Sequence, residues 1–306
     1  MLEALANELP SGTIRYLSKV VAIEEFGFHK IIHLADGTII KTKVLIGCDG
    51  VDSLVAKWIG FKQASFVGRC ATRGYLESKG THGLEPSIMQ YFGKGFRAGV
   101  IPCDDRGVSW FFTWTPTSQD KETVENPAKL KQFVLNKLQN MPIDVRSIIE
   151  ETDINSFLPY PLRYRHPWEL MFGNISKGNV CVVGDAFHPM TPDIGQGGCC
   201  ALEDAIVLAR CLAEAFSKES MRDIKVMDEE EKAKELYKKI EGSLKKYADV
   251  RRWRSIDLVA SSYMAGYIQQ SESKLATFLR DNILAGFLGS LLLKKSNYDC
   301  GKLNSS

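Results

Sequence analysis

One stretch of the chain, GDAFHPMTPDIGQGG at residues 184–198, concentrates the residues best suited to hold a ligand. Within it, Gly184 permits close approach of a ligand to the backbone. The Asp185 carboxylate can accept hydrogen bonds from the hydroxyls of a ribose-like or ribityl chain. Gly195, Gly197 and Gly198 let backbone N–H groups face a flat ligand without a Cβ atom in the way. The stretch therefore predicts a site for a flat molecule that carries a hydroxylated chain.

The same stretch leads into a predicted helix, which begins near Gly198 and ends near Phe216. The positive end of its dipole points at the glycines and favours an anion, or a group that becomes anionic. Pro189 and Pro192 stiffen the loop before the helix. A reduced isoalloxazine ring, negative around N1 and C2=O, has the shape and charge that this arrangement favours.

Two short apolar runs, residues 44–47 and 180–183, are predicted strands that position these groups. The second delivers Gly184 and Asp185 at its C-terminal end, which is where α/β sheets bind ligands. The first is also predicted to be buried, and it ends at Asp49 and Gly50. Each strand thus ends in a turn that pairs an aspartate with a glycine.

The remaining patterns predict an inserted β-rich block and a helical C-terminal part. Residues 64–165 contain short strands at 87–92, 96–102 and 108–115, with one helix near 127–139. A strand is expected at 13–24, and a hairpin turned at Asp36 and Gly37 follows it. A helical region is expected at 227–268, because Leu236, Ile240, Leu244 and Tyr247 form an apolar stripe.

The stretch GDAFHPMTPDIGQGGCCALEDA closely resembles the G-D-A-x-H-P-x-x-P-x-x-G-Q-G motif of FAD-dependent, aromatic-hydroxylase-type monooxygenases. That family includes para-hydroxybenzoate hydroxylase and the plant zeaxanthin epoxidase-like group. Residues 44–60, VLIGCDGVDSLVAKWIG, resemble the D-G motif of the same family, and YDCGKL near the C-terminus resembles the plant group more weakly. The two main motifs occur in the family's order, with a strand-rich domain between them.

The resemblance implies an FAD-dependent enzyme with NADH or NADPH as the reductant. Its substrates would be O₂ and an apolar or aromatic small molecule, hydroxylated or epoxidised through a flavin C4a-hydroperoxide. Most of the chemistry would belong to the cofactor, while the protein positions the substrate and excludes water.

The resemblance also assigns roles to individual residues. Asp185, after Gly184, would bind the ribityl or pyrophosphate region, and Pro192 would lie near the flavin edge where oxygen reacts. The segment Gly195, Gln196, Gly197 and Gly198 would face the pyrimidine end of the ring. Asp49 and Gly50 would contact FAD and lie on the route of NAD(P)H, although Ala56 stands where the family usually has an arginine.

Three side-chain assignments keep alternatives. His188 is a catalytic candidate as a proton shuttle, but the favoured role is to brace the loop. Arg73 either lines the outer face of the flavin or is an ordinary strand-surface residue. The aromatic residues Trp110, Phe111, Phe112 and Trp114 are expected to divide between the core and a substrate wall.

The fold class expected is α/β: an incomplete FAD-binding Rossmann-like domain with an inserted antiparallel substrate domain and C-terminal helices. The expected parts are residues 1–63, 64–165, 166–218 and 219–306. No G-x-G-x-x-G stands between a strand and a helix, and the near match at residues 93–98 is assigned to a hairpin turn. We therefore expect the chain to lack the first βαβ unit and to bind FAD weakly, if at all, on its own.

Composition limits the other classes. With 39 basic and 37 acidic residues and a net charge of +2, the chain shows no basic excess that would indicate nucleic acid as a partner. Its eight cysteines form no C-x-x-C pair, so no metal site is expected, and they favour a reducing compartment, cytosol or plastid. Residues 283–293 are apolar but too short to span a bilayer, and peripheral membrane contact is the alternative to a core helix.

Two rival functions stand beside the monooxygenase. A flavin-dependent halogenase or simple oxidase shares the fold, but the five tryptophans lack the W-x-W-x-I-P spacing of halogenases. The second rival is a catalytically inactive chain that acts as an interaction or regulatory module.

Overall fold

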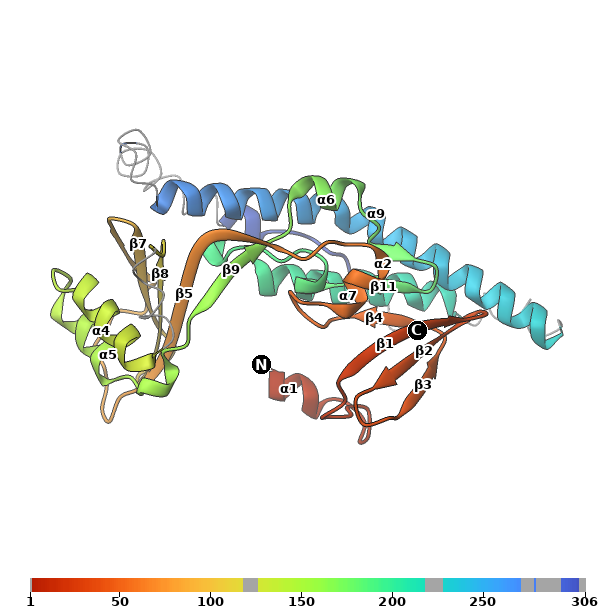
Figure 1. Cartoon of the computed structure of the whole chain (residues 1–306), viewed down its shortest axis with the longest axis horizontal. Helices are drawn as coiled ribbons and strands as arrows, with labels where there is room; N and C mark the ends of the chain where they lie inside the picture. Colours follow the sequence, from red (N-terminus) through yellow and green to blue (C-terminus); the bar gives the residue numbers. More distant parts are fainter. Residues whose placement is uncertain (1, 118–125, 218–227, 271–277, 279–292, 303–306) are drawn as a thin grey trace.

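The computed structural model describes residues 2–117, 126–217, 228–270, 278 and 293–302. Figure 1 shows a long helix running beside two neighbouring bodies, one built on a five-stranded sheet and the other on two three-stranded sheets. The class is α/β with antiparallel sheets and C-terminal helices, which confirms the sequence prediction. The domain boundaries after residues 63, 165 and 218 stay predictions.

The α/β body is built on a small sheet of order β10-β11-β4. Strand β11 (Val180–Val182) runs parallel to β4 (Leu45–Gly47) and antiparallel to β10 (Ser176–Lys177). Strand β11 is fully buried, because α2 (Leu54–Ile59), α7 (Gly197–Ala215) and α9 (Glu229–Gln270) contribute side chains to the apolar core around it.

Strand β4 was predicted to be buried, and this prediction is wrong for two of its three residues. Only Gly47 is buried, whereas Ile46 is 36% exposed. The reason is that β4 is the outermost strand of its sheet and pairs with β11 alone among the described strands. An apolar run of this kind predicts a central strand, but in this structure the strand lies at the edge of its sheet.

A separate antiparallel sheet precedes β4. Its strands are β1 (Val20–Phe26), β2 (His29–Leu34) and β3 (Ile39–Thr42), and the β2–β3 turn contains Gly37 with φ +84°, as the Asp-Gly pair predicted. The strand expected from residue 13 begins only at Val20. The chain before it turns instead of extending, since Leu17 has φ +54°.

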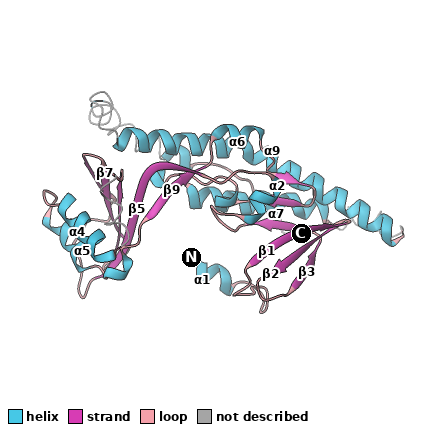
Figure 2. Cartoon of the chain, viewed as in Figure 1, coloured by secondary structure: helices cyan, strands magenta, loops and turns pink. Residues whose placement is uncertain are grey.

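The five-stranded sheet has the order β6-β7-β8-β5-β9 and is antiparallel throughout, as expected. Helices α4 (Pro127–Lys137) and α5 (Ile143–Glu151) lie beside it in Figure 2, and their apolar side chains share a core with the sheet. The near match at residues 93–98 is the β6–β7 hairpin turn, with Gly95 at φ +71°. The five strands are β5 (Ser65–Glu77), β6 (Met89–Gly93), β7 (Phe96–Pro102), β8 (Gly107–Trp114) and β9 (Tyr160–Tyr164).

Helix α9 has 42 residues and connects the two bodies, as Figure 1 shows. Its predicted stripe of Leu236, Ile240, Leu244 and Tyr247 is buried. Near its middle it packs against α6 (Pro167–Phe172), and near its C-terminus it reaches β6 and β7. The isolated helix α1 (Leu2–Asn7) has no buried residue.

Within the described residues, no helix is both long enough and apolar enough to cross a membrane. The apolar segment 283–293 lies outside the described residues except for Leu293. The peripheral membrane contact expected there therefore stays a prediction.

Candidate functional site

The two acid–glycine turns lie at one edge of the α/β sheet. Strands β4 and β11 are parallel and in register, with Gly47 opposite Val182. Because the carboxyl ends of parallel strands meet at the same edge, the turns at residues 49–50 and 184–185 leave the sheet together. The structure thus brings together both motifs that the sequence singled out.

The Asp49 carboxylate binds the N-terminus of helix α2. Its Oδ2 accepts hydrogen bonds from the backbone N–H groups of Leu54 at 2.7 Å and Val55 at 3.3 Å, while Oδ1 accepts from the Ser53 hydroxyl at 2.5 Å. Asp49 stays exposed. Gly50, at φ +79°, has nothing within 4 Å of where a Cβ would lie. Both residues are therefore ordered by α2 and open to a ligand.

Gly184 begins a 3₁₀ turn (Gly184–Ala186) from which Asp185 projects. Gly184 has φ +56°, its N–H donates to Asp204 Oδ2 at 2.9 Å, and a Cβ on it would lie 3.4 Å from the Cβ of Ala201 on α7. Asp185 is exposed, and none of the described residues forms a hydrogen bond with its carboxylate. Partial desolvation raises the pKa of this carboxyl, and the charge of His188 opposes the rise.

The loop before α7 presents a row of open glycines. The 3₁₀ turn Pro192–Ile194 ends at Gly195, whose φ of +64° is the left-handed conformation that glycine adopts most easily. Nothing lies within 4 Å of the positions that a Cβ would take on Gly195 or Gly198, and only Met190 approaches that of Gly197, at 3.8 Å. We call the backbone of residues 195–198 the glycine cradle.

Helix α7 starts inside the glycine cradle without a capping side chain. Gln196 occupies the N-cap position and makes no side-chain hydrogen bond to the helix. Gln196 is buried, and its Oε1 has no hydrogen-bond partner within the described part of the chain. The first N–H groups of a 19-residue helix are thus available to a negative group.

His188 lies in a buried charge network that the sequence analysis missed. Its Nε2 lies 2.7 Å from Asp204 Oδ2, and Arg251 Nε donates to Asp204 Oδ1 at 2.7 Å. Arg251 Nη1 is 2.8 Å from Glu203 Oε2, an ion contact without hydrogen-bond geometry. His188, Asp204 and Arg251 are all fully buried. We call these four residues the His188 network.

The charge state of His188 follows from this network. Burial disfavours its protonation, but the hydrogen bond and charge of Asp204 outweigh burial and raise the pKa of His188 to about 10. Burial likewise opposes ionisation of Asp204, yet His188 and Arg251 keep the pKa of that carboxyl low. A pair that stays charged around neutral pH favours the bracing role of His188 over a proton shuttle. The signal in the sequence is the pair Glu203 and Asp204 within the apolar face of α7.

Asp193 connects the glycine cradle to the five-stranded sheet, and the sequence analysis missed this too. Its Oδ2 accepts from Arg69 Nη2 at 2.7 Å, and its Oδ1 lies 3.2 Å from Arg97 Nη2. Gln270 Oε1 accepts from Arg69 Nη1 at 2.9 Å. All four side chains are buried. The loop that carries Pro192 is therefore tied to strands β5 and β7.

A cavity of about 510 Å³ opens between Pro192 and the five-stranded sheet. Its walls include Trp110, Phe111 and Tyr160, with the guanidinium of Arg73 5.7 Å from the Tyr160 ring centroid. The expected division of the aromatic run is found. Phe111 lines the cavity, whereas Trp110, Phe112 and Trp114 belong to the core on the side of α4, with Trp110 also bordering the cavity. The remaining lining residues are Ala71, Thr72, Arg97, Ile101, Ser109, Thr113 and Leu162.

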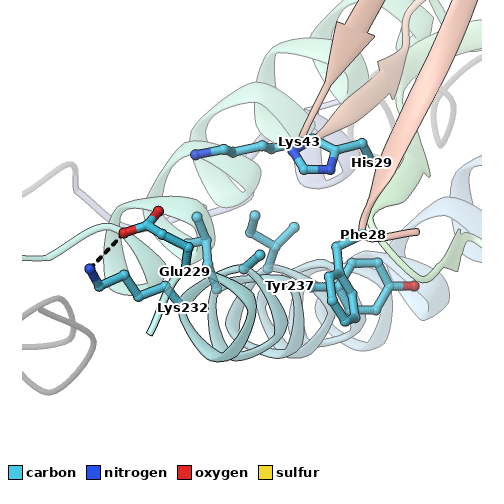
Figure 3. A pocket seen from close by; sticks show the side chains of 9 residues that line it. Phe28, His29, Lys43, Glu229, Lys232 and Tyr237 are labelled. Atoms are coloured by element: carbon cyan, nitrogen blue, oxygen red, sulfur yellow. Dashed lines mark hydrogen bonds and ion pairs between the residues drawn. The ribbon is translucent and has the colours of Figure 1, made fainter. Parts of the chain in front are cut away.

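Two other cavities lie away from Pro192. One, of about 550 Å³, borders Ser53 at the start of α2 and is lined by Lys57, Lys62 and Arg165 among others. The other, of about 410 Å³, lies between β2 and the N-terminal part of α9, where Figure 3 shows Phe28 and Tyr237 on one side and Lys43 on another. None of its lining residues is a candidate site residue of the sequence analysis, and its Leu236 and Ile240 belong to the apolar stripe of α9.

A metal ion does not fit the one cluster of ligand-type atoms found among the described residues. His188, Cys200 and Asp204 bring their ligand atoms within 4.8 Å of one another. However, both Asp204 oxygens already accept hydrogen bonds, and the cationic Arg251 contacts Asp204 Oδ1 and Cys200 Sγ. A cation there would meet two positive side chains.

Comparison with known proteins adds the family. A family model described as an FAD binding domain matches residues 2–233. Monooxygenase 2 of Arabidopsis thaliana is 52% identical over 303 residues, which cover 99% of this chain and 73% of that protein. Monooxygenase 1 of the same plant is 32% identical over 99% of this chain and 74% of its own length. These matches do not favour the inactive interaction module.

Solved structures show the same fold. Klebsiella pneumoniae HpxO complexed with FAD and uric acid aligns with a TM-score of 0.71 at 22% identity, covering 91% of this chain and 66% of that one. A salicylate hydroxylase substrate complex aligns with a TM-score of 0.64 at 18% identity, covering 100% and 75%.

The residues at the strand edge fit FAD. An exposed carboxylate at Asp185 suits the hydroxyls of a ribityl chain, and the glycine cradle admits a flat ring. The uncapped start of α7 and the unpartnered Gln196 Oε1 offer polar contacts to the pyrimidine end of that ring. Asp185, Gln196 and the open glycines thus present exposed or unpartnered groups, whereas the Gly184 N–H and the Asp49 carboxylate already have hydrogen-bond partners, so the assignment of these residues to FAD stays a prediction.

Proposed function

Since the chain belongs to the family of FAD-binding monooxygenases, we propose that it transfers one oxygen atom of O₂ to an apolar or aromatic small molecule, with NADH or NADPH as the reductant. FAD supplies the electron transfer and the activation of O₂ when it is bound. The chain's own residues bind the cofactor, orient the substrate and exclude water from the reacting atoms.

The observation that carries this proposal is the position of Pro192. It belongs to the loop that forms the glycine cradle and also lines the 510 Å³ cavity. A flat substrate in that cavity would lie next to the edge of a ring held by the cradle. Cavities of a few hundred Å³ with apolar and aromatic walls and few polar groups are typical small-molecule sites.

The walls of this cavity favour a planar substrate. Phe111 and Tyr160 provide aromatic surface, and Arg73 can stack on the same ligand from the exposed side. Among the proteins of similar fold, HpxO was solved in complex with uric acid, and another is a salicylate hydroxylase substrate complex. Planar ring compounds are therefore the substrate class that we propose for this chain.

The reductant would approach along the 550 Å³ cavity beside the start of α2. Lys57 and Lys62 are exposed there and supply positive charge, although the arginine usual at position 56 is absent. A dinucleotide carries phosphates that such lysines attract. All eight cysteines are free, which supports the proposal of a reducing compartment.

The test is to express this chain, add FAD, and follow NADH or NADPH oxidation and O₂ consumption while flavin fluorescence is recorded. The proposal expects fluorescence quenching together with oxidation that planar aromatic compounds stimulate. The variant Pro192→Ala separates the two effects, because it alters the wall shared with the cavity and should reduce stimulation more than quenching. Absence of quenching at high micromolar FAD would refute the proposal for this chain.

A further inference from the structure

The C-terminal segment 295–301 folds back onto helices α7 and α9, next to the His188 network. Cys300 O accepts a hydrogen bond from Arg210 Nη1 at 2.7 Å, and Lys295 O accepts from Arg254 Nη2 at 2.6 Å. Lys295 Nζ also contacts Asp257. Three residues from two helices that are separate in the sequence therefore hold one short segment.

Tyr298 is the centre of this segment. The Arg254 guanidinium lies 4.6 Å from the centroid of its ring, and that of Arg251 lies 5.3 Å away. Two cations against one aromatic ring are attracted by the ring quadrupole, most strongly where water is excluded. Arg254 also forms two hydrogen bonds with Glu203, at 2.8 and 3.1 Å, so it joins the tyrosine to the His188 network.

Gly301 completes the contact with α7. It has φ +76°, and a Cβ on it would collide with the guanidinium of Arg210. Its N–H donates to Asp299 Oδ1 at 2.8 Å, which shapes the turn. Any residue other than glycine would strain the backbone at this positive φ and would displace either the Arg210 guanidinium, which bonds Cys300 O, or the segment itself.

A continuous series of contacts leads from Tyr298 to the flavin-facing turn. Tyr298 covers Arg251, Arg251 Nε binds Asp204 Oδ1, and Asp204 Oδ2 accepts both the Gly184 N–H at 2.9 Å and a hydrogen bond from His188 Nε2 at 2.7 Å. Asp204 therefore anchors both ends of the turn that carries Asp185. The ion pair between Arg251 and Asp204 is strong only while the Arg251 guanidinium stays buried and shielded from water.

We propose that the segment 295–301 is a clamp, with Tyr298 as a positioning residue that holds Arg251 on Asp204 and thereby fixes the turn that presents Asp185 to FAD. The clamp depends on the proposed function only in one respect, which is that FAD binding serves as one of its two measurements. Without the ring, water would reach the Arg251 guanidinium, and the ion pairs of the His188 network would weaken.

The test uses Tyr298→Ala and Tyr298→Phe, with Asn297→Ala as the matched control, since Asn297 is exposed and its side chain has no hydrogen bond among the described residues. The first readout is alkylation of Cys200, which is fully buried and in contact with Arg251, followed residue by residue by mass spectrometry. The second is the dissociation constant of FAD from fluorescence quenching. The phenylalanine variant retains the aromatic face, so it should behave as the wild type does.

We expect Tyr298→Ala to expose Cys200 to alkylation and to weaken FAD binding about tenfold, a factor that loss of one cation–π contact can supply. Tyr298→Phe and Asn297→Ala should change neither readout. Gly301→Ala should act in the same direction as Tyr298→Ala.

Protection of Cys200 in Tyr298→Ala at the wild-type level would overturn the clamp. Exposure of Cys200 with unchanged FAD affinity would overturn the positioning role. If the wild-type chain does not quench FAD at all, the proposed function fails, while the Cys200 result still decides whether the clamp exists.

Discussion

Asp193 forms a two-pronged ion pair with Arg69: Oδ2 accepts from Nη2 at 2.7 Å, and Oδ1 accepts from Nη1 at 3.0 Å. The two residues are 124 positions apart in sequence, and both side chains are buried. The contact joins the loop of Pro192 to strand β5. It fixes this loop relative to the walls of the cavity.

This pair predicts a large loss of stability on truncation. Asp193→Ala leaves Arg69 and Arg97 as uncompensated buried charges, so the free energy of unfolding should fall by about 3–5 kcal/mol. Urea denaturation measures it. The control is Asp52→Ala, which removes an exposed ion pair with Arg163 and should cost at most about 1 kcal/mol. Equal losses in the two variants would show that the Asp193 pair is not effectively buried.

The His188 network predicts a pH dependence of stability. The pKa of His188 is raised from 6.5 to about 10 in the folded protein, so its stabilising contribution is complete below about pH 6.5 and is lost as the pH rises through 10. In His188→Asn this contribution is absent at every pH. The difference in unfolding free energy between wild type and His188→Asn should therefore shrink between pH 6.5 and 10. A constant difference over that range would mean that His188 is neutral in the folded chain.

Substitutions of Phe111 and Phe112, neighbours on β8, should have different effects on stability and on substrate selectivity. The reason is that successive residues of a strand face opposite sides of the sheet. Phe112 is fully buried in the core, so Phe112→Ala should cost about 3–5 kcal/mol of stability. Phe111 lines the cavity, so Phe111→Ala should cost clearly less but change which aromatic compounds stimulate NAD(P)H oxidation. Similar losses of stability for both, with unchanged selectivity, would contradict the assignment of the cavity wall.

Substitution of Gly195 should lower both the stability of the fold and the affinity for FAD. Gly195→Ala places a Cβ at φ +64°, which costs about 1–2 kcal/mol, and it also narrows the open side of the glycine cradle. Denaturation and FAD titration measure the two effects. The control is Gly242→Ala inside α9, where no atom lies within 4 Å and the change should stabilise by about 1 kcal/mol. Unimpaired FAD affinity in Gly195→Ala would place the ring elsewhere.

The sequence predicted the parts of the fold that depend on local patterns. Strand β7 and the stripe of α9 follow from periodicity, and the β2–β3 turn follows from an Asp-Gly pair. The edge position of β4 could not be predicted, because a short apolar run does not reveal how many neighbours a strand has. The late start of β1 could not be predicted either, since nothing in the residue type of Leu17 signals its positive φ.

For the site, the motif resemblance identified the candidate ligand-binding residues but missed the buried ion pairs that hold their loops in place. Asp185, Pro192 and the glycines lie in one continuous stretch, so their grouping is local. Asp193 and Asp204 depend on arginines contributed from distant strands and from α9, and no spacing rule connects such partners. The local sign of Asp204 is its place within the apolar face of α7, whereas Asp193, in the 3₁₀ turn before α7, has no such sign.

The most direct test of the proposed FAD site is an FAD titration of the wild-type chain and Asp185→Ala, monitored by flavin fluorescence, with Asp105→Ala as an exposed control far along the chain. We predict weak but saturable quenching in the wild type and in Asp105→Ala. Binding should be about tenfold weaker in Asp185→Ala, the effect of losing one hydrogen bond to a charged group. Equal affinity in all three proteins, or no quenching in any of them, would contradict the site.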